Sequence, residues 1–382
     1  MKFYTEENKV IKSWCNNPED GTIDQARNLA NLPFLFKHVA LMPDGHQGYG
    51  MPIGGVIACN SVVIPNAVGV DIGCGMAVVK TTLTEITISE LKTIMSGIRK
   101  RIPVGFSHHK RMQDFSLMPE LTDEKIVSEQ YLSASRQLGT LGGGNHFIEI
   151  QKGSDGHIWI MIHSGSRNLG YKVAKYYNEI AKEANKKWYT QVDPKNDLAF
   201  LPIDMDDCQN YLKEMEYCLK FAKANRALMI ENIKCAFGEV FAEISFDNFI
   251  DIHHNYVAIE NHFGKNVWIH RKGATSAKEG QTGIIPGSQG TSSYIVRGKG
   301  NPDSFKSCSH GAGRKMGRKE ARKSLNLEDE QKKLDGVIHS VRSEKDLDEA
   351  CGAYKNINIV MEEQKDLVDI VIRMEPLAVI KG

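Results

Sequence analysis

Short apolar runs alternate along the chain with longer segments in which apolar residues recur every three or four positions. The short runs predict buried strands, because continuous aliphatic residues over such lengths suit the interior of a sheet. They lie at 56–58, 62–64, 77–79, 147–150 and 158–162, with a further short strand expected at 337–339. The three- and four-residue recurrence predicts amphipathic helices at 88–100, 125–138, 170–187, about 205–236 and, as the last helix, near 355–374.

Strands and helices mix along the sequence without a strict strand–helix–strand alternation. No internal repeat, low-complexity tract or linker rich in proline or serine divides the 382 residues. A chain of this length can bury a large core without disulfides. We therefore expect an α+β fold in which residues 1–382 form one intertwined domain.

Charge and cysteine usage narrow the functional classes. The 48 Lys and Arg residues are balanced by 47 Asp and Glu residues, so the protein does not coat nucleic acid through bulk charge, and any RNA contact must be local. The eight cysteines are scattered singly, a pattern of reduced thiols that predicts a cytoplasmic protein. The N-terminus lacks an apolar signal region and no stretch approaches 18 uncharged apolar residues, so we expect neither secretion nor membrane insertion.

An acid and a thiol lie three residues apart in the glycine-rich run 69–75. They are Asp71 and Cys74, and two such anions held close together repel each other unless a cation lies between them. A thiolate flanked by glycines allows close backbone approach and can bridge two cations. The alternative is that Cys74 is a small buried hydrophobe, as free cysteines often are, but the nearby acid favours a metal site.

Two histidines in comparable settings follow further along the chain. His146 comes after three glycines and Asn145, whose amide suits a phosphate oxygen, and it precedes a predicted strand. His163 ends the predicted strand at 158–162 and is followed by small residues and Arg167, a guanidinium that can bind phosphate in a bidentate manner. We expect both histidines to join the acid and the thiol as metal ligands.

A third candidate ligand lies in the pair His253-His254. Consecutive side chains on an extended chain point to opposite faces, so only one of the two can face a common metal. The spacing does not choose between them.

His310 is surrounded by small residues and followed by the basic residues 314–319, which we expect to form a helix. Backbone N–H groups at the helix start, together with Arg314, would form an anion site and leave a neutral His310 free to attack phosphorus. The plainer interpretation is a solvent-exposed basic helix with a capping serine.

The standard nucleotide-binding loops are absent from the sequence. Residues 286–294 offer backbone amides and hydroxyls suited to a base or ribose but lack the Gly-Lys-Ser/Thr of a Walker A loop. Residues 48–52 have the wrong spacing for a dinucleotide fingerprint. Residues 333–336 match the Lys-x-Asp-Gly signature of ligases that form a lysine–AMP adduct, but a turn after a solvated charge run explains them better.

Taken in order, these segments resemble the RtcB family of RNA ligases, and the match runs from Asp44-Gly45-His46-Gln47-Gly48 to Lys381-Gly382. The resemblance implies the family's α+β domain, with mixed sheets around a central metal- and nucleotide-binding cleft. It implies two Mn²⁺ ions, with Cys74 bridging, held by Asp71, Cys74, His146, His163 and His254. It further implies that GTP guanylylates His310, that RNA phosphates contact Arg167 and Arg314, and that the nucleotide is bound by Asn145, Glu149, Ser288, Ser292, Gly311, Ala312, Gly313, Tyr354 and Lys381.

The implied reaction joins an RNA end bearing a 3′-phosphate or 2′,3′-cyclic phosphate to a 5′-hydroxyl end, in RNA splicing or repair. The cyclic end is opened to a 3′-phosphate, which receives GMP from His310 before the 5′-hydroxyl expels that GMP. Gln289, where methionine is usual in the family, bears on nucleotide preference. Two other classes remain open: a metal-dependent phosphohydrolase or cyclic phosphodiesterase that opens RNA ends without resealing them, and a non-catalytic RNA-end binder. The sequence contains no signal for or against an activating protein of the archease type.

Overall fold

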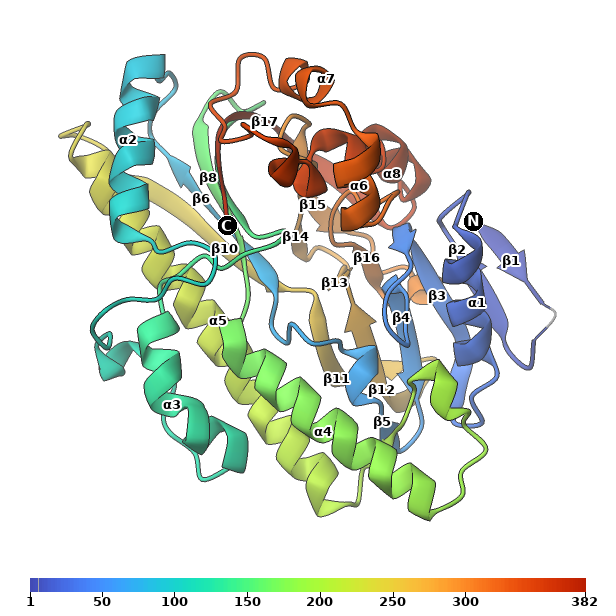
Figure 1. Ribbon diagram of the computed structural model, residues 1–382. Coiled ribbons are helices and arrows are strands. Elements are labelled where there is room, and N and C mark those ends of the chain that lie inside the picture. The colour runs from blue at the N-terminus through green and yellow to red at the C-terminus, as the bar shows by residue number, and fades with distance from the viewer. Residues whose placement is uncertain (6) are drawn as a thin grey trace.

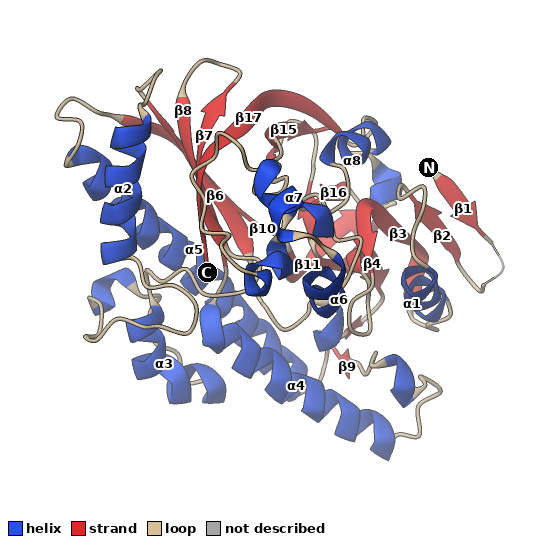
Figure 2. Cartoon of the chain, turned by 45° about the horizontal axis from the view of Figure 1, so that its top comes forward, coloured by secondary structure: helices blue, strands red, loops and turns tan. Residues whose placement is uncertain are grey.

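The computed structural model describes residues 1–5 and 7–382. In these described residues two large sheets are accompanied by two-stranded ribbons, and helices surround them (Figures 1 and 2). The first large sheet is mixed, because β2 and β3 pair in parallel whereas their neighbours are antiparallel. Its six strands, in spatial order, are β1 (Lys2–Tyr4), β2 (Val10–Ser13), β3 (Leu35–His46), β4 (Ile53–Cys59), β12 (Lys265–Lys272) and β11 (Asn255–His262).

The second large sheet is antiparallel throughout. Within the described part of the chain its seven strands, in spatial order, are β10 (Phe246–His253), β6 (Gly75–Thr81), β8 (Ile158–Ser164), β7 (Phe147–Gly153), β17 (Val368–Lys381), β15 (Ser293–Gly298) and β14 (Thr282–Ile285). The ribbons pair β13 (Ala274–Ser276) with β16 (Ser307–Ser309) and β5 (Val62–Val63) with β9 (Leu201–Pro202). The expected α+β class with mixed sheets is confirmed, whereas the single domain over residues 1–382 stays a prediction.

Four of the expected helices are present with nearly the predicted bounds. They are α2 (Ile88–Arg101), α3 (Lys125–Gln137), α4 (Arg167–Lys187) and α5 (Asp206–Gly238), and the remaining helices are α1 (Asp20–Ala30), α6 (Arg318–Ser324), α7 (Leu327–Lys332) and α8 (Ile357–Glu363). The start of α2 is fixed by a capping box between Thr87 and Glu90. Among the helices of the described residues, none combines the length and apolar character needed to cross a membrane.

Alternation along the strands of the second sheet divides its core into two faces. In β6, Ala77 and Val79 pack with α2 and α5, whereas Met76 and Val78 pack on the opposite face with Trp159. The sheet is therefore buried on both sides, which holds its strand ends in fixed positions.

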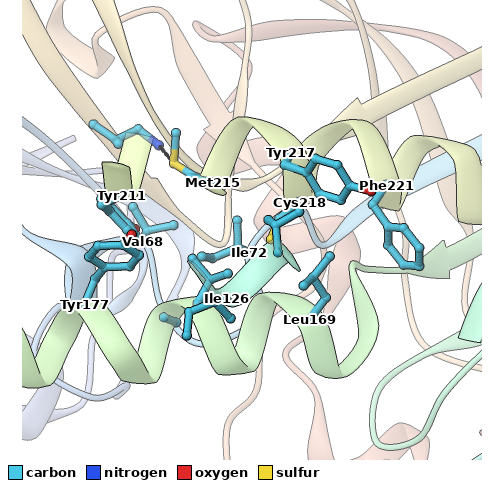
Figure 3. Packing of buried hydrophobic residues seen from close by; sticks show 14 of the residues in the cluster. Val68, Ile72, Ile126, Leu169, Tyr177, Tyr211, Met215, Tyr217, Cys218 and Phe221 are labelled. Carbon is cyan, nitrogen blue, oxygen red and sulfur yellow. Dashed lines mark hydrogen bonds between the residues drawn. The ribbon is translucent and has the colours of Figure 1, made fainter. Parts of the chain in front are cut away.

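A further core cluster lies between α4 and α5 and reaches the glycine-rich run 69–75 (Figure 3). Ile72 is fully buried there, close to Leu169 of α4 and Cys218 of α5. Because burying an aliphatic side chain contributes about 1.5–3 kcal/mol, Ile72 anchors the loop on which Asp71 and Cys74 lie.

The expected last helix near 355–374 is wrong in its second half. Helix α8 ends at Glu363, and β17 begins at Val368 and pairs with both β7 and β15. The segment is rich in β-branched residues, and pairing with two distant strands outweighs the local helical periodicity. Pro376 is accommodated where the register with β7 shifts.

Two shorter expectations also need correction, and several elements were not expected. The basic helix does not start at residue 314, because α6 begins at Arg318 after Gly317, and Arg314 forms an isolated bridge with Tyr354 instead. The strand expected at 337–339 is reduced to one bridge between Ile338 and Ala378. The N-terminal strands, α1 and the β10–β12 segment were not predicted.

Candidate active site

The side chains expected to bind metal lie along one edge of the seven-stranded sheet, the edge formed by the ends of four neighbouring strands. Strand β6 begins directly after Cys74 and β7 directly after His146, whereas His163 is the penultimate residue of β8 and β10 ends directly before His254. Because neighbouring strands run antiparallel, the start of one lies beside the end of the next. Four segments that are far apart in sequence therefore bring their side chains to the same place.

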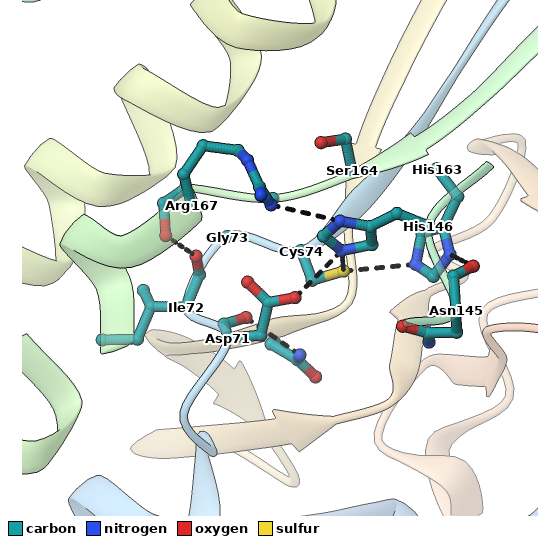
Figure 4. Close-up of polar contacts among 12 residues, drawn as sticks. Asp71, Ile72, Gly73, Cys74, Asn145, His146, His163, Ser164 and Arg167 are labelled. Carbon is teal, nitrogen blue, oxygen red and sulfur yellow. Dashed lines mark hydrogen bonds and ion pairs between the residues drawn. The ribbon is translucent and has the colours of Figure 1, made fainter. Parts of the chain in front are cut away.

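Two overlapping groups of ligand atoms form at this edge. One comprises Cys74, His163 and His254, the other Asp71, Cys74 and His146, and within each group the atoms lie within 4.8 Å of one another. Figure 4 shows the second group with His163: Cys74 Sγ is 3.2 Å from His163 Nε2 and 3.5 Å from His146 Nε2, which in turn is 3.1 Å from Asp71 Oδ2. Cys74 belongs to both groups, as a sulfur that bridges two cations must.

Backbone carbonyls orient two of the imidazoles toward this cluster. His146 Nδ1 lies 2.9 Å from the Leu141 carbonyl oxygen. His163 Nδ1 lies 3.2 Å from the Asn145 carbonyl oxygen (Figure 4). A proton on His163 Nδ1 satisfies the Asn145 carbonyl and leaves the Nε2 lone pair of that ring directed at the thiol. His163 Nε2 and His254 Nε2 are 3.4 Å apart, so the imidazole nitrogens converge on one small volume.

Burial sets the protonation of these groups. It lowers the pKa values of His163 and His254 well below the usual imidazole value, so both rings keep a lone pair. Burial, and next the Asp71 carboxylate, raise the pKa of the Cys74 thiol well above its usual value. Burial opposes ionisation of Asp71 as well, but the hydrogen bond and charge of His146 outweigh it and lower the pKa of Asp71 to about 2. A divalent cation at this place would favour the thiolate.

The paired histidines point in different directions. His254 joins the cluster, whereas His253 Nδ1 lies 3.2 Å from the Nη2 atom of Arg226. Arg226 is fully buried and donates to the Asp251 carboxylate at 2.6 and 2.9 Å. It also donates to two backbone carbonyls, one of them directly before Cys74, and so holds the loop of residues 69–75 in place. His254 is therefore the histidine that lies beside the thiol.

His310 lies next to the cluster. It directly follows β16, and its ring centroid is 4.8 Å from that of His254. Its Nδ1 is 2.6 Å from Oδ2 of Asp44, and the same oxygen accepts the His310 backbone N–H at 3.1 Å. Burial opposes ionisation of Asp44, but the hydrogen bond and charge of His310 outweigh it and lower the pKa of Asp44. The carboxylate thus holds a proton on Nδ1 and leaves Nε2 as the nitrogen free to react.

Sequence reasoning gave Asp44 no role, although the residue lies in the stretch 44–48 that supports the family resemblance. Asp44 is 266 positions from His310, so no local spacing connects the two. The signal in the sequence was only the presence of Gly313; in the structure this residue has a φ of +73°, and a Cβ atom there would collide with the Asp44 backbone. A glycine with both properties marks a close approach of another part of the chain.

A cavity of about 590 Å³ opens beside His310 and the cluster. Its size is in the range of small-molecule and cofactor sites. The expected phosphate-binding Arg314 lines it, as do most of the expected nucleotide-binding residues: Asn145, Glu149, Ser288, Gly311, Ala312, Gly313, Tyr354 and Lys381.

Glu349 organises one wall of this cavity and was not predicted. Its carboxylate accepts hydrogen bonds from Arg314 at 3.1 Å, from Arg318 at 2.9 Å and from the Tyr354 hydroxyl, and Lys381 Nζ lies 3.6 Å away. Burial opposes its ionisation, but Lys381 and Arg314 outweigh burial and lower the pKa of Glu349. Three cations around one carboxylate leave this wall net positive, which suits a phosphate-bearing ligand.

A second carboxyl group faces the cavity in a different state. Glu149, on β7, is buried, and burial raises its pKa to about 8 even though Lys381 acts in the opposite direction. Burial also lowers the pKa of Lys381. Near neutral pH, Glu149 can therefore hold a proton and act as a hydrogen-bond donor.

Three expected site residues do not line the cavity. His146 is one of them, since its Nε2 faces Cys74 and Asp71 instead. Arg167 places Nη1 3.2 Å from His146 Nδ1 and so supports that ring from behind (Figure 4). The Ser292 hydroxyl is bonded to Glu375 and Arg373, outside the cavity.

Comparisons with known proteins show the family of this chain. The family model described as tRNA-splicing ligase RtcB matches residues 25–128 and 107–382. The RNA-splicing ligase RtcB of Escherichia coli K12 is 38% identical over 411 residues, which cover 100% of this chain and 99% of the relative. The tRNA-splicing ligases RtcB of Nanoarchaeum equitans and Thermococcus kodakarensis are 34% and 30% identical, each over 95% of this chain and 92% of the relative. The chain therefore belongs to the RtcB family.

Proposed function

We propose that this protein is a GTP- and Mn²⁺-dependent RNA ligase that joins 3′-phosphate or 2′,3′-cyclic phosphate ends of RNA to 5′-hydroxyl ends. The names of the family model and of the relatives, RNA- or tRNA-splicing ligase, support RNA as the substrate. One observation in this chain carries the proposal: the His310 ring lies beside the thiol–imidazole cluster and its Nδ1 is held by Asp44. A nucleophilic nitrogen and a set of metal ligands thus share one cavity.

The donor set fits two divalent cations. A thiol, three imidazoles and a carboxylate converge, and the thiol belongs to both groups of atoms. We infer that Asp71, Cys74 and His146 would hold one ion and that Cys74, His163 and His254 would hold the other. Bound there, such ions polarise phosphoryl oxygens and neutralise the charge that develops on them during phosphoryl transfer.

The residues around His310 suit it to form a covalent GMP intermediate. His310 Nε2 attacks the α-phosphorus of GTP, an N–P bond forms, and the P–O bond to pyrophosphate breaks. The Asp44 carboxylate, hydrogen-bonded to Nδ1–H, stabilises the positive charge that the imidazole acquires. An oxygen of the RNA 3′-phosphate then takes the GMP and restores neutral His310. Finally the 5′-hydroxyl attacks the 3′-phosphorus, loses its proton to solvent, and expels GMP.

The cavity walls supply what binding of the nucleotide requires. Arg314 and Lys381 offer positive charge near phosphates, and a protonated Glu149 offers a donor and an acceptor to a base edge. Ser288 and Asn145 add short polar groups on the same walls. We also propose RNA phosphate contacts for Arg167 and Arg314 and a nucleotide contact for Ser292, which would need its present hydrogen bonds to rearrange.

The test is labelling with α-labelled GTP and Mn²⁺ in the absence of RNA. We expect an acid-labile GMP adduct on the parent protein and none on His310→Ala. The matched control is Lys333→Ala, because this lysine of the Lys-x-Asp-Gly run pairs with Glu330 at 2.6 Å and lies outside the cavity. Label that survives His310→Ala but disappears in Lys333→Ala would overturn the proposal.

Joining of a 3′-phosphate RNA to a 5′-hydroxyl RNA, followed on a denaturing gel, completes the test. A protein that opens the cyclic phosphate but neither takes up GMP nor joins the ends would be a hydrolase. We expect joined product from the parent and none from His310→Ala.

A further inference from the structure

The loop between α2 and α3 carries an exposed aromatic side chain and is hydrogen-bonded to the segment that leads to Asn145 in the cavity wall. It has no role in the reaction described above. Phe106 is fully exposed, at 100% of its free surface. It follows Gly105, which has a φ of +64°, in a tight turn closed by the Ser107 N–H donating to the Val104 carbonyl at 3.2 Å. The turn thus holds the phenyl ring away from the protein core. Figure 1 shows this loop in teal between the two helices.

The loop that begins with Phe106 is also unusually rich in exposed apolar residues. Of the twenty exposed large apolar side chains among the described residues, five fall in residues 106–121. Single exposed apolar residues are common, but a cluster of them marks an interaction surface.

The stretch that runs from α2 into the start of this loop has a one-sided charge, whereas Asp114 and Glu120 follow later in the loop. Residues 91–113 contain six Lys or Arg residues and no Asp or Glu. Within the loop, Lys110 and Arg111 are exposed, and neither forms an ion pair with any described residue. In a chain whose charges otherwise balance, unpaired cations beside an exposed aromatic ring are suited to an anionic ligand with flat rings.

The backbone ties this loop directly to the metal-binding edge. Gly105 N–H donates to the Gly142 carbonyl at 2.9 Å, and Leu141 N–H donates to the Pro103 carbonyl at 3.0 Å. Gly142 is three residues before Asn145, which lines the cavity, and four before the metal-ligand candidate His146. The loop that carries Phe106 is therefore fixed against the segment that leads into the cavity wall.

A further cation flanks the same segment. Arg318, which lines the cavity, places Nη2 within 2.9 Å of where a Cβ atom of Gly144 would be. Residues 142–144 thus lie between the Arg318 guanidinium on the cavity side and the loop that carries Lys110 and Arg111 on the other side. A side chain larger than glycine at residue 144 would collide with this guanidinium.

We propose that residues 105–111 form a platform for single-stranded RNA, with a base stacked on Phe106 and phosphates bound by Lys110 and Arg111. This inference rests on the proposed function, because the strand is expected to end in the cavity. The positive charge of Lys110 and Arg111, and the backbone hydrogen bonds that connect the loop to the cavity wall, favour RNA over a protein partner. Stacking requires an unpaired base, so the platform serves single strands and not a duplex.

The test is binding of fluorescent RNA that ends in a 3′-phosphate, measured by anisotropy for single strands of about ten nucleotides. From the usual contribution of base–aromatic stacking, we expect Phe106→Ala to weaken binding by about 5- to 100-fold and Phe106→Trp to retain it. A dinucleotide 3′-phosphate, which is too short to leave the cavity, should bind to Phe106→Ala and to the parent equally. The control is Tyr189→Ala, an exposed aromatic residue beyond the far end of α4, about 30 Å from the start of that helix.

A second variant tests the charges. Lys110→Ala/Arg111→Ala should reduce the slope of log Kd against log salt concentration by about 1 to 1.5 for single-stranded RNA. Lys186→Ala/Lys187→Ala, at the distant end of α4, should leave the slope unchanged.

The outcomes separate this inference from the proposed function. GMP labelling without RNA should be the same in Phe106→Ala as in the parent, so a parent that takes up no label refutes the ligase proposal and not the platform. Equal binding of the ten-nucleotide RNA by Phe106→Ala and the parent would overturn the platform and point to a protein partner at this loop. An equal loss in Tyr189→Ala would overturn it as well, since the effect would not be local.

Discussion

Replacement of Asp44 by asparagine tests how the fold activates His310. Asp44 is completely buried, and a single oxygen, Oδ2, accepts both the His310 ring N–H at 2.6 Å and its backbone N–H at 3.1 Å. Asparagine matches the shape of the side chain but removes the negative charge. The imidazole can then still be held, but the positive charge it gains during attack on GTP is no longer balanced.

The size of the effect follows from the type of bond that is lost. Hydrogen bonds to charged groups contribute about 1.5–3 kcal/mol, and 1.36 kcal/mol corresponds to a tenfold change in rate. We therefore expect Asp44→Asn to slow formation of the GMP adduct by about 10- to 150-fold. The KM for GTP should stay near that of the parent, because Asp44 does not line the nucleotide cavity.

The assay is the initial rate of labelling from α-labelled GTP at saturating GTP and Mn²⁺. Asp303→Asn is the matched control, since Asp303 pairs with Lys12 at 2.6 Å away from the cavity and its replacement should leave the rate unchanged. Labelling of Asp44→Asn at the parent rate, with an unchanged melting temperature, would refute the argument that the carboxylate stabilises the charged imidazole.

Three further predictions concern the metals, stability and pH. Cys74→Ala removes the atom common to both ligand groups, so bound Mn²⁺ per chain, measured by mass spectrometry after desalting, should fall; an unchanged content would contradict the bridging role. Arg226→Met leaves the buried Asp251 carboxylate unpaired and should lower the free energy of unfolding by about 3–5 kcal/mol in denaturant titrations. An unchanged free energy of unfolding would show that water reaches the acid and would contradict this prediction. Burial raises the pKa of Glu149 to about 8, so the folded state keeps a proton that the unfolded state loses, and stability should fall as pH rises from about 5 to 8. Glu149→Gln should flatten that profile, and an identical profile would show that another group is responsible.

The sequence predicted the metal-ligand candidates better than it predicted their supports. Asp71 and Cys74 share one loop, and His146 and His163 lie at the ends of predicted strands, so residue type and local context were enough to select these four. His254 was chosen over His253 only by the family resemblance. Asp44 and Glu349 were not selected, because their partners lie far away in sequence or in segments whose local structure was uncertain. An isolated acid carries no local signal, and its function depends on contacts that only the folded chain creates.

Pairing of distant strands explains both the convergence of the site and the main error in the predicted fold. A helix extending to residue 374 would have left no reason for Lys381 to approach the metal-binding edge. As the last residue of β17, Lys381 instead pairs with Phe147 at the start of β7, and its Nζ lies 3.6 Å from Glu349. Strand β7 therefore brings His146 beside His163 through its pairing with β8, and its pairing with β17 places a lysine in the wall of the cavity. In an antiparallel sheet, each added strand brings one of its two ends to this edge. Residues from distant parts of the sequence can therefore meet around one phosphate.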